Sequence, residues 1–149
     1  MWCAAYTGRT QERGREVKKT YLGGCHCGAV RFAVDVDVGA GTTKCNCTIC
    51  SKSRLWTVQA TPETFRLTRG QEALQDYSFS SHVAHSYFCR ICGVRPYQYV
   101  KVPDGPTYYN VNLACLDGVD IDELMGAPVT YVDQLNDRWW ESPAEVRHL

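Results

Sequence analysis

Seven cysteines stand in three short clusters whose spacing suits metal binding. The clusters are Cys25-x-Cys27, Cys45-x-Cys47-x-x-Cys50 and Cys89-x-x-Cys92. Thiolates packed this closely repel one another unless a cation lies between them, and four-cysteine sets are a common structural zinc site. Glycines flank the first and third clusters, where positive φ lets backbone N–H groups point at thiolate sulfur. The pattern favours metal sites over disulfides or scattered buried thiols.

Seven thiols divide into a closed set of four and an open set of three. A structural zinc takes four protein ligands, whereas a catalytic zinc takes three and keeps one position open. One division pairs the last two cysteines of the middle cluster with the third cluster, in a ribbon-like site. The other pairs the first cluster with the third and leaves the middle cluster, KCNCTIC at residues 44–50, as a three-ligand face. Contiguity favours the second division, because one short turn can hold three sulfurs around one ion.

An open zinc with three thiolate ligands suits sulfur chemistry better than hydrolysis. Three thiolates donate charge heavily, so water bound there is less acidic than water on a three-histidine zinc. A soft fourth ligand fits better, and a substrate thiol is the natural candidate. Zinc would hold that thiol as a thiolate, which attacks carbonyl carbon. The alternative is a second structural zinc, closed by a histidine or by water.

Residues that follow the middle cluster could contact such a substrate. Lys52 and Arg54 offer cations for carboxylates, and Trp56 could form a wall of the pocket. Arg95, after the third cluster, could do the same as the two bases. For each of these side chains the alternative is ordinary: a solvated base or a core aromatic. Two histidines could supply a fourth ligand or a proton relay, or could be ordinary surface residues: His82 and His85.

Composition and charge narrow the class of protein. The 149 residues suffice for one domain, and sixteen basic residues balance sixteen acidic ones. Net charge therefore supplies no pull toward nucleic acid or anionic lipid, and we expect neither as a partner. No apolar run approaches the ~18 residues of a membrane span, and no signal peptide is evident. A cytoplasmic location, where thiols stay reduced, is the expectation.

Hydrophobic periodicity predicts a mostly-β domain. Residues 30–38 alternate apolar and polar side chains, which is typical of a half-buried strand, and two shorter stretches near residues 97–99 and 109–113 repeat the pattern. Thr61-Pro62-Glu63 predicts a single turn with an N-cap, and Asp120 with Glu123 predicts a capping box for a short helix. Residues 1–20 show no periodicity and read as a flexible extension to a domain of residues 21–149.

The motifs GGCHCGAVRF, KCNCTIC, YFCRICGVRP and NLACLDG, in that order, resemble the glutathione-dependent formaldehyde-activating enzyme family, which includes centromere protein V. The segment YVDQLNDRWWESP is similar to the family's C-terminal part. The resemblance implies a β-tent fold of short antiparallel strands and two zinc ions per chain. It implies a structural zinc on Cys25, Cys27, Cys89 and Cys92, and a catalytic zinc on Cys45, Cys47 and Cys50.

The activity that this resemblance implies is carbon–sulfur lyase chemistry on a thiol substrate such as glutathione. The family's reaction combines glutathione with formaldehyde to give S-hydroxymethylglutathione. Two rivals stay open: a zinc-stabilised module for protein or chromatin association, and a glutathione carrier without turnover. A chromatin binder should carry a long basic segment. Only the first twenty residues have an excess of basic side chains, with five Lys or Arg against two Glu. Cys115 is interpreted as a buried small hydrophobe and Cys3 as an incidental thiol.

Overall fold

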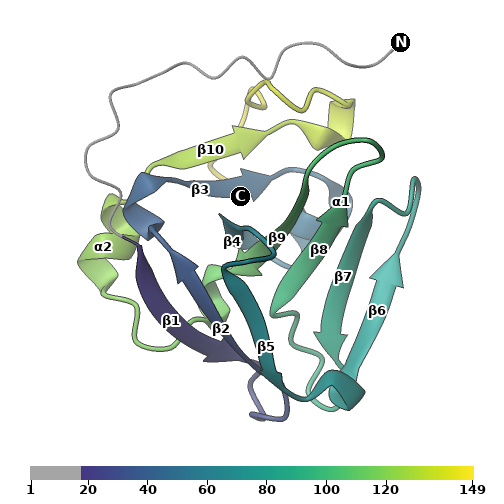
Figure 1. Cartoon of the computed structure of the whole chain (residues 1–149). Coiled ribbons are helices and arrows are strands. Elements are labelled where there is room, and N and C mark those ends of the chain that lie inside the picture. Colours follow the sequence, from purple (N-terminus) through teal and green to yellow (C-terminus); the bar gives the residue numbers. More distant parts are fainter. Residues whose placement is uncertain (1–17) are drawn as a thin grey trace.

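The computed structural model describes residues 18–149, which form two β-sheets (Figure 1). The smaller sheet has the order β1-β2-β5, and the larger has the order β10-β3-β4-β9-β8-β7-β6. The strands are β1 (Lys19–Gly24), β2 (Arg31–Val36), β3 (Thr42–Cys45), β4 (Trp56–Ala60), β5 (Phe65–Arg69), β6 (Leu74–Ser78), β7 (Ala84–Cys89), β8 (Tyr97–Lys101), β9 (Thr107–Asn112) and β10 (Val129–Val132).

Helix is scarce, which confirms the predicted mostly-β class. The described residues contain two short α-helices, α1 (Thr48–Lys52) and α2 (Ile121–Gly126). They also contain four single 3-10 turns: η1 (Val38–Ala40), η2 (Gln71–Ala73), η3 (Leu113–Cys115) and η4 (Gln134–Asn136). The domain is therefore held by strand pairing and by packing between the sheets.

The alternating stretch of residues 30–38 forms β2, the central strand of the smaller sheet. Val30, Phe32, Val34 and Val36 are all buried, as period-two alternation requires. The strand ends at Val36, because the chain turns into η1 immediately afterwards. β2 pairs antiparallel with β1 on one side and with β5 on the other.

Aromatic side chains fill the space between the two sheets. The ring of Phe65 on β5 stacks on Tyr109 of β9 with centroids 4.2 Å apart, and Phe32 of β2 stacks on Phe65 at 5.5 Å. Tyr97 of β8 packs against the same ring at 4.6 Å. Such offset and tilted arrangements add to the free energy gained by apolar burial. This aromatic cluster fixes the smaller sheet against the larger one.

One strand pair departs from the expected antiparallel arrangement. β10 runs parallel to β3, with Val129 opposite Thr42 and Val132 opposite Cys45. A parallel neighbour cannot be reached by a tight hairpin, and here the chain arrives through β9, η3 and α2. Figure 1 shows β10 covering the outer edge of β3. The residues that follow β10 consequently lie beside the middle cysteine cluster.

The two predicted local motifs form in modified ways. At residues 61–64 the Thr61 carbonyl accepts from two backbone N–H groups, which closes a single turn into β5 without a helix. Asp120 caps α2, because its Oδ1 accepts from the backbone N–H of Asp122 at 2.9 Å and of Glu123 at 3.0 Å. The Glu123 carboxylate does not complete the box. It accepts from Tyr21 Oη and from the ammonium of Lys19, which ties α2 to β1.

The smaller sheet begins two residues before the boundary predicted for the extension. Lys19 pairs with Val36, and Thr20 pairs with Asp35. The Thr20 hydroxyl also donates to the Asp35 carboxylate at 2.6 Å. Residues 1–17 of the predicted extension, including Cys3, lie outside the described residues.

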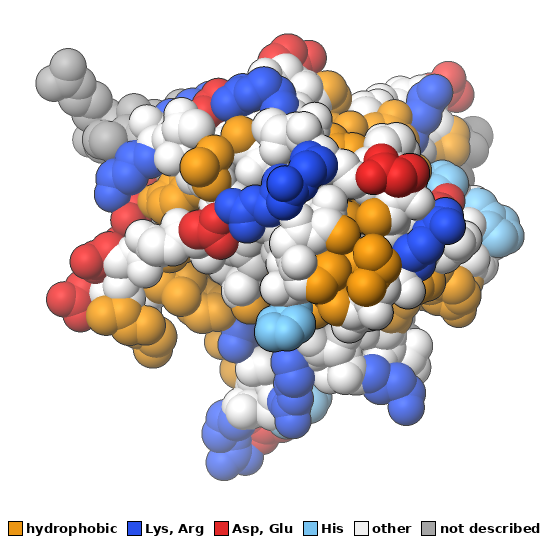
Figure 2. Space-filling model, turned by 90° about the horizontal axis from the view of Figure 1, so that it is seen from below, with side chains coloured by type: hydrophobic (Ala, Val, Ile, Leu, Met, Phe, Trp, Pro, Cys, Tyr) orange, Lys and Arg blue, Asp and Glu red, His pale blue; other side chains and the backbone are white. Residues whose placement is uncertain are grey.

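The surface seen from below mixes several kinds of side chain. Acidic and basic groups both reach this face, and small hydrophobic patches lie between them (Figure 2). Within residues 18–149, no helix has the length and apolar character needed to cross a membrane.

Candidate metal centres and the adjoining pocket

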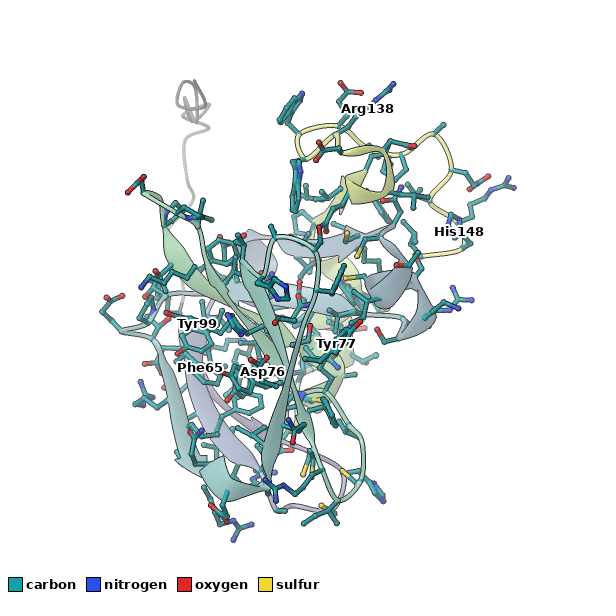
Figure 3. All side chains as sticks on the ribbon, turned by 90° about the vertical axis from the view of Figure 1, so that its right-hand side faces the viewer. Phe65, Asp76, Tyr77, Tyr99, Arg138 and His148 are labelled. Atoms are coloured by element: carbon teal, nitrogen blue, oxygen red, sulfur yellow. The ribbon has the colours of Figure 1, made fainter. Side chains whose placement is uncertain are left out.

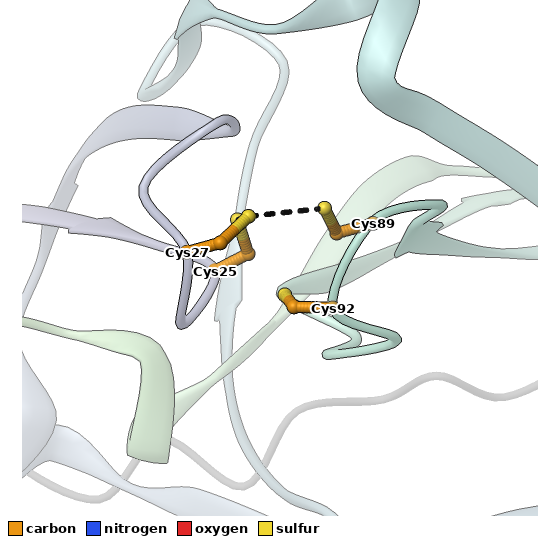
Figure 4. A group of neighbouring side chains, drawn as sticks. All are labelled: Cys25, Cys27, Cys89 and Cys92. Carbon is orange, nitrogen blue, oxygen red and sulfur yellow. Dashed lines mark hydrogen bonds between the residues drawn. The ribbon is translucent and has the colours of Figure 1, made fainter.

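The first and third cysteine clusters meet in a group of four thiols (Figure 4). The sulfurs of Cys25, Cys27, Cys89 and Cys92 all lie within 4.8 Å of one another. Cys27 Sγ is 3.6 Å from Cys25 Sγ and 3.7 Å from Cys89 Sγ. A tetrahedral zinc with bonds of about 2.3 Å requires sulfurs about 3.8 Å apart, so this set fits the ion.

Two tight turns aim these thiols at one point. Gly28 and Gly93 adopt positive φ, 75° and 76°, which a residue with a side chain rarely does. In each turn the glycine N–H donates to the carbonyl of the cluster's first cysteine, Cys25 or Cys89. The backbone N–H of Val30 also donates to Cys25 Sγ at 3.3 Å, and such bonds stabilise a thiolate.

The four-thiol group joins the two sheets. Its first pair follows β1 of the smaller sheet, and its second pair follows β7 of the larger sheet. Cys25 and Cys89 are buried, whereas Cys27 is exposed. Backbone N–H groups of residues 27 and 94 lower the pKa of the Cys92 thiol to about 6. A cation held here would cross-link the layers.

The middle cluster forms a separate group of three thiols. Cys45 ends β3, and Cys47 and Cys50 lie at the start of α1 and within it. Their sulfurs lie within 4.8 Å of one another, and no fourth His, Cys, Asp or Glu of the described chain joins them. The Cys47 N–H donates to Cys45 Sγ at 3.4 Å. Of the two divisions that the spacing allowed, the structure has the one with a compact three-thiol face.

The three thiols share negative charge unequally. The pKa of Cys47 is strongly lowered, because Cys45 and Cys50 donate hydrogen bonds to its sulfur and backbone N–H groups of α1 add to them. The pKa of Cys45 rises to about 11 and that of Cys50 rises too, since each faces the charge on Cys47. Three thiols this close cannot all ionise without a cation. The donor set therefore fits a thiophilic ion such as zinc.

Arg95 places a positive charge beside this group. Burial lowers the pKa of its guanidinium, while the nearby charges of Cys50 and Cys47 raise it. Its Nη2 donates to Ser53 Oγ at 2.6 Å, and its buried Nε has no partner. No carboxylate of residues 18–149 forms an ion pair with it. Arg95 therefore remains available to an anion from outside the protein.

A pocket of about 490 Å³ opens along α1, the helix that carries Cys50, although none of the three cysteines lines it. Thr48 and Ile49, which lie between Cys47 and Cys50 on α1, form part of its wall. Figure 3 shows Tyr77 directed away from Tyr99 and Phe65, on the side of the larger sheet opposite the aromatic core. The side chains that line the pocket are Thr48, Ile49, Lys52, Ser53, Tyr77, Phe79, Ser86, Phe88 and Arg95, with Gly93.

Of the four side chains predicted as possible substrate contacts, Lys52 and Arg95 line this pocket, whereas Arg54 and Trp56 do not. Arg54 adopts positive φ, 49°, and its guanidinium donates to the carbonyl of His148. Trp56 is half-buried, and the ammonium of Lys44 lies 4.9 Å from its ring centroid. These two side chains thus contact other parts of the protein.

Neither predicted histidine approaches the thiols. The Nδ1 of His82 lies 2.9 Å from Ser78 Oγ, and that of His85 lies 2.6 Å from Asp76 Oδ2. His85 lies on β7, and His82 lies in the loop between β6 and β7. Closure of the three-thiol group by a histidine therefore finds no support in residues 18–149.

The segment YVDQLNDRWWESP stands out in the sequence, but its contact with the middle cysteine cluster was not predicted. Cys45 Sγ donates to Gln134 Oε1 at 3.1 Å. Asn46, which is buried, donates to Asp133 and accepts from the backbone N–H of Leu135 at 2.9 Å. The one available signal was an asparagine inside a cysteine cluster, because a buried amide needs partners. Its partners could not be read from the sequence.

The model of the glutathione-dependent formaldehyde-activating enzyme family matches residues 20–132. The chain belongs to this family. A solved structure agrees: a crystal structure of a Rhodobacter sphaeroides protein, determined as a structural genomics target, is 34% identical and superposes with a TM-score of 0.63. The match covers 73% of this chain and 99% of the other.

The family match ends with β10, at residue 132. Both thiol groups fall within the part shared with the glutathione-dependent formaldehyde-activating enzymes. Gln134 and the rest of the C-terminal segment lie beyond it. The contact to Cys45 therefore comes from a part of this chain that the family model does not describe.

Proposed function

We propose that this protein is a zinc-dependent carbon–sulfur lyase that joins a carboxylate-bearing thiol, such as glutathione, to an aldehyde and reverses that reaction. The formation of S-hydroxymethylglutathione from formaldehyde is the reaction associated with its family. The observation that carries the proposal is the three-thiol group beside a pocket lined by two cations, Lys52 and Arg95. Eight described cysteines are free thiols, which suits a reducing, cytoplasmic setting.

The three thiols would hold the catalytic ion. Zinc bound by Cys45, Cys47 and Cys50 would supply an open position that favours a substrate thiol in its nucleophilic thiolate form. As the carbon–sulfur bond forms, the proton of the thiol passes to the carbonyl oxygen of the aldehyde. Neither oxidant nor reductant is required.

The surrounding side chains would bind and orient the substrate. Arg95 would offset the net negative charge of three thiolates on one divalent ion. Those of its N–H groups that have no partner in the protein would donate hydrogen bonds to an anionic substrate. Lys52, on the same side of the pocket, offers a second cation for a carboxylate. Holding both reactants beside the thiols would contribute the usual gain from proximity.

The four-thiol group would hold a structural zinc. Four ligands leave no open position, so Cys25, Cys27, Cys89 and Cys92 would contribute folding free energy rather than chemistry. Two zinc ions per chain follow from the two groups.

Exchange spectroscopy tests the proposal directly. The zinc-loaded protein should accelerate the interconversion of glutathione plus formaldehyde with S-hydroxymethylglutathione, measured by NMR magnetisation transfer at equilibrium. Cys47→Ser, which removes one ligand of the open site, should abolish the acceleration. Glutathione binding without acceleration would identify a carrier instead. Absence of both binding and acceleration at millimolar glutathione would favour an association module.

A further inference from the structure

One wall of the pocket presents aromatic side chains to solvent. Tyr77 and Phe79 stack on each other with ring centroids 5.8 Å apart and an interplanar angle of 23°. Tyr77 is 51% exposed and Phe79 is 39% exposed, so a substantial part of each side chain faces solvent. Phe88 and Ile49 extend this wall. Contiguous exposed apolar surface in a concave site marks a place where a ligand binds.

Strand pairing puts part of this wall on one face of the larger sheet. Tyr77 on β6 lies opposite Ser86 on β7, and both line the pocket. Phe88 follows two residues after Ser86 within β7, so period-two alternation returns it to this face. Phe79 lies one residue past the end of β6, and its ring stacks on that of Tyr77.

The pocket lining combines two kinds of side chain. Lys52, Ser53 and Arg95 are polar or cationic, and Arg95 Nη2 donates to Ser53 Oγ, whereas Tyr77, Phe79 and Phe88 are aromatic. No acidic residue of the described chain lines the pocket. A volume of about 490 Å³ lies within the range of small-molecule sites, roughly 300–1,000 Å³. A hydroxymethyl group has one carbon, and it would leave the aromatic wall without contacts.

We propose that the aldehyde handled by this site carries an aromatic or similarly large apolar group. This inference rests on the proposed lyase function and specifies its substrate class. The thiol sulfur bonds to the aldehyde carbon, the thiol proton passes to the carbonyl oxygen, and the product is an S-(1-hydroxyalkyl) adduct. Its carboxylates face Lys52 and Arg95, while its apolar group lies against Tyr77 and Phe79.

Binding of stable thioethers tests the recognition without turnover. S-benzylglutathione and S-methylglutathione share the peptide and differ only in the group on sulfur. The zinc-loaded protein should bind the benzyl compound at least about tenfold more tightly, because a phenyl ring is removed from water. Phe79→Ala should lower the affinity for S-benzylglutathione severalfold more than the affinity for S-methylglutathione. Ile121→Ala, which removes an exposed apolar side chain on α2 outside the pocket, should change neither affinity.

Exchange rates with two aldehydes extend the test to the reaction. Phenylacetaldehyde differs from acetaldehyde by its phenyl group, and its exchange with glutathione should be accelerated more strongly. Equal thioether affinities, or catalysis of formaldehyde exchange alone, would overturn this inference and leave the lyase proposal standing. A clear benzyl preference without exchange of any aldehyde would support the aromatic site and overturn the lyase proposal.

Discussion

Gln134 accepts a hydrogen bond from the Cys45 thiol over 3.1 Å, although 89 positions separate the two residues in the chain. The parallel pairing of β10 with β3 makes this contact, because Val132 lies opposite Cys45 and the chain then turns into η4. Asn46 also donates a hydrogen bond to Asp133, which further holds the segment after β10 against the middle cysteine cluster. The open face of the three-thiol group is thus bordered by the C-terminal segment.

Gln134 should stabilise metal binding at the three-thiol group. Once Cys45 is a metal-bound thiolate, the amide of Gln134 can present its N–H to the sulfur. Removing such a partner typically lowers metal affinity about 10–100-fold. Gln134→Leu should therefore lose one of two zinc ions to a competing chelator well before the wild type does. Gln59→Leu, at an exposed position of β4, is the control, and equal retention in both variants would contradict the expectation.

The two thiol groups should differ in what their loss does to the fold. A structural zinc site contributes an apparent binding free energy of about 10–16 kcal/mol, as large as the whole stability of a typical domain. Cys89→Ser should consequently yield unfolded or aggregated protein. Cys47→Ser should remain folded by circular dichroism and contain one zinc by elemental analysis. If both variants collapsed alike, two structural sites would be the better description.

Arg95 should contribute to substrate binding, whereas Arg54 should not. Hydrogen bonds to charged groups are worth about 1.5–3 kcal/mol, which corresponds to roughly a 10-fold to 100-fold change in affinity. Arg95→Met should weaken the binding of glutathione by that factor in a calorimetric titration. Arg54→Met is the matched control, because the Arg54 guanidinium contacts His148 and does not line the pocket. An equal loss in the two variants would assign both effects to general electrostatics.

The sequence predicts the thiol groups better than the pocket around them. Cysteine spacing and turn glycines are local features, so the division into four and three could be anticipated. Proximity in sequence was a poor guide to the substrate contacts, because the chain turns at Arg54 and carries Trp56 away from the pocket. Gln134 reaches Cys45 through the pairing of β10 with β3, and the pocket brings Tyr77 and Phe79 together with residues of α1, which lie well apart from them in the chain. A single sequence displays no signature of either arrangement.

The stability of the protein at alkaline pH should depend on the hydrogen bond from Tyr21 of β1 to Glu123 of α2. Burial, together with the hydrogen bond to Glu123, raises the pKa of Tyr21 to about 12, from an ordinary value of about 10. The folded state therefore favours the protonated phenol. This contribution to stability is complete below pH 10 and is lost as the pH rises through about 12.

Tyr21→Phe should remove that pH dependence. Loss of the hydrogen bond should cost about 1 kcal/mol at neutral pH, measured by urea unfolding. Between pH 10 and 12 the variant should lose less stability than the wild type. The other tyrosines remain in both proteins, so the difference between the two curves isolates residue 21. Parallel curves over this range would contradict the assignment.

The parallel β3–β10 pair has a consequence for the order of events during biosynthesis. The ligands of the four-thiol group have all been synthesised once residue 92 has left the ribosome, so a nascent chain can already close that cross-link between the sheets. β10 and Gln134 are made some forty residues after Cys92. The contact between Gln134 and Cys45 therefore joins segments that are 89 positions apart. Because contacts between distant segments form late and slowly, the three-thiol group stays uncovered on the growing polypeptide. A metal ion at the four-thiol group would be captured during translation, whereas the three-thiol group would gain its contact to Gln134 only after the C-terminal segment is made.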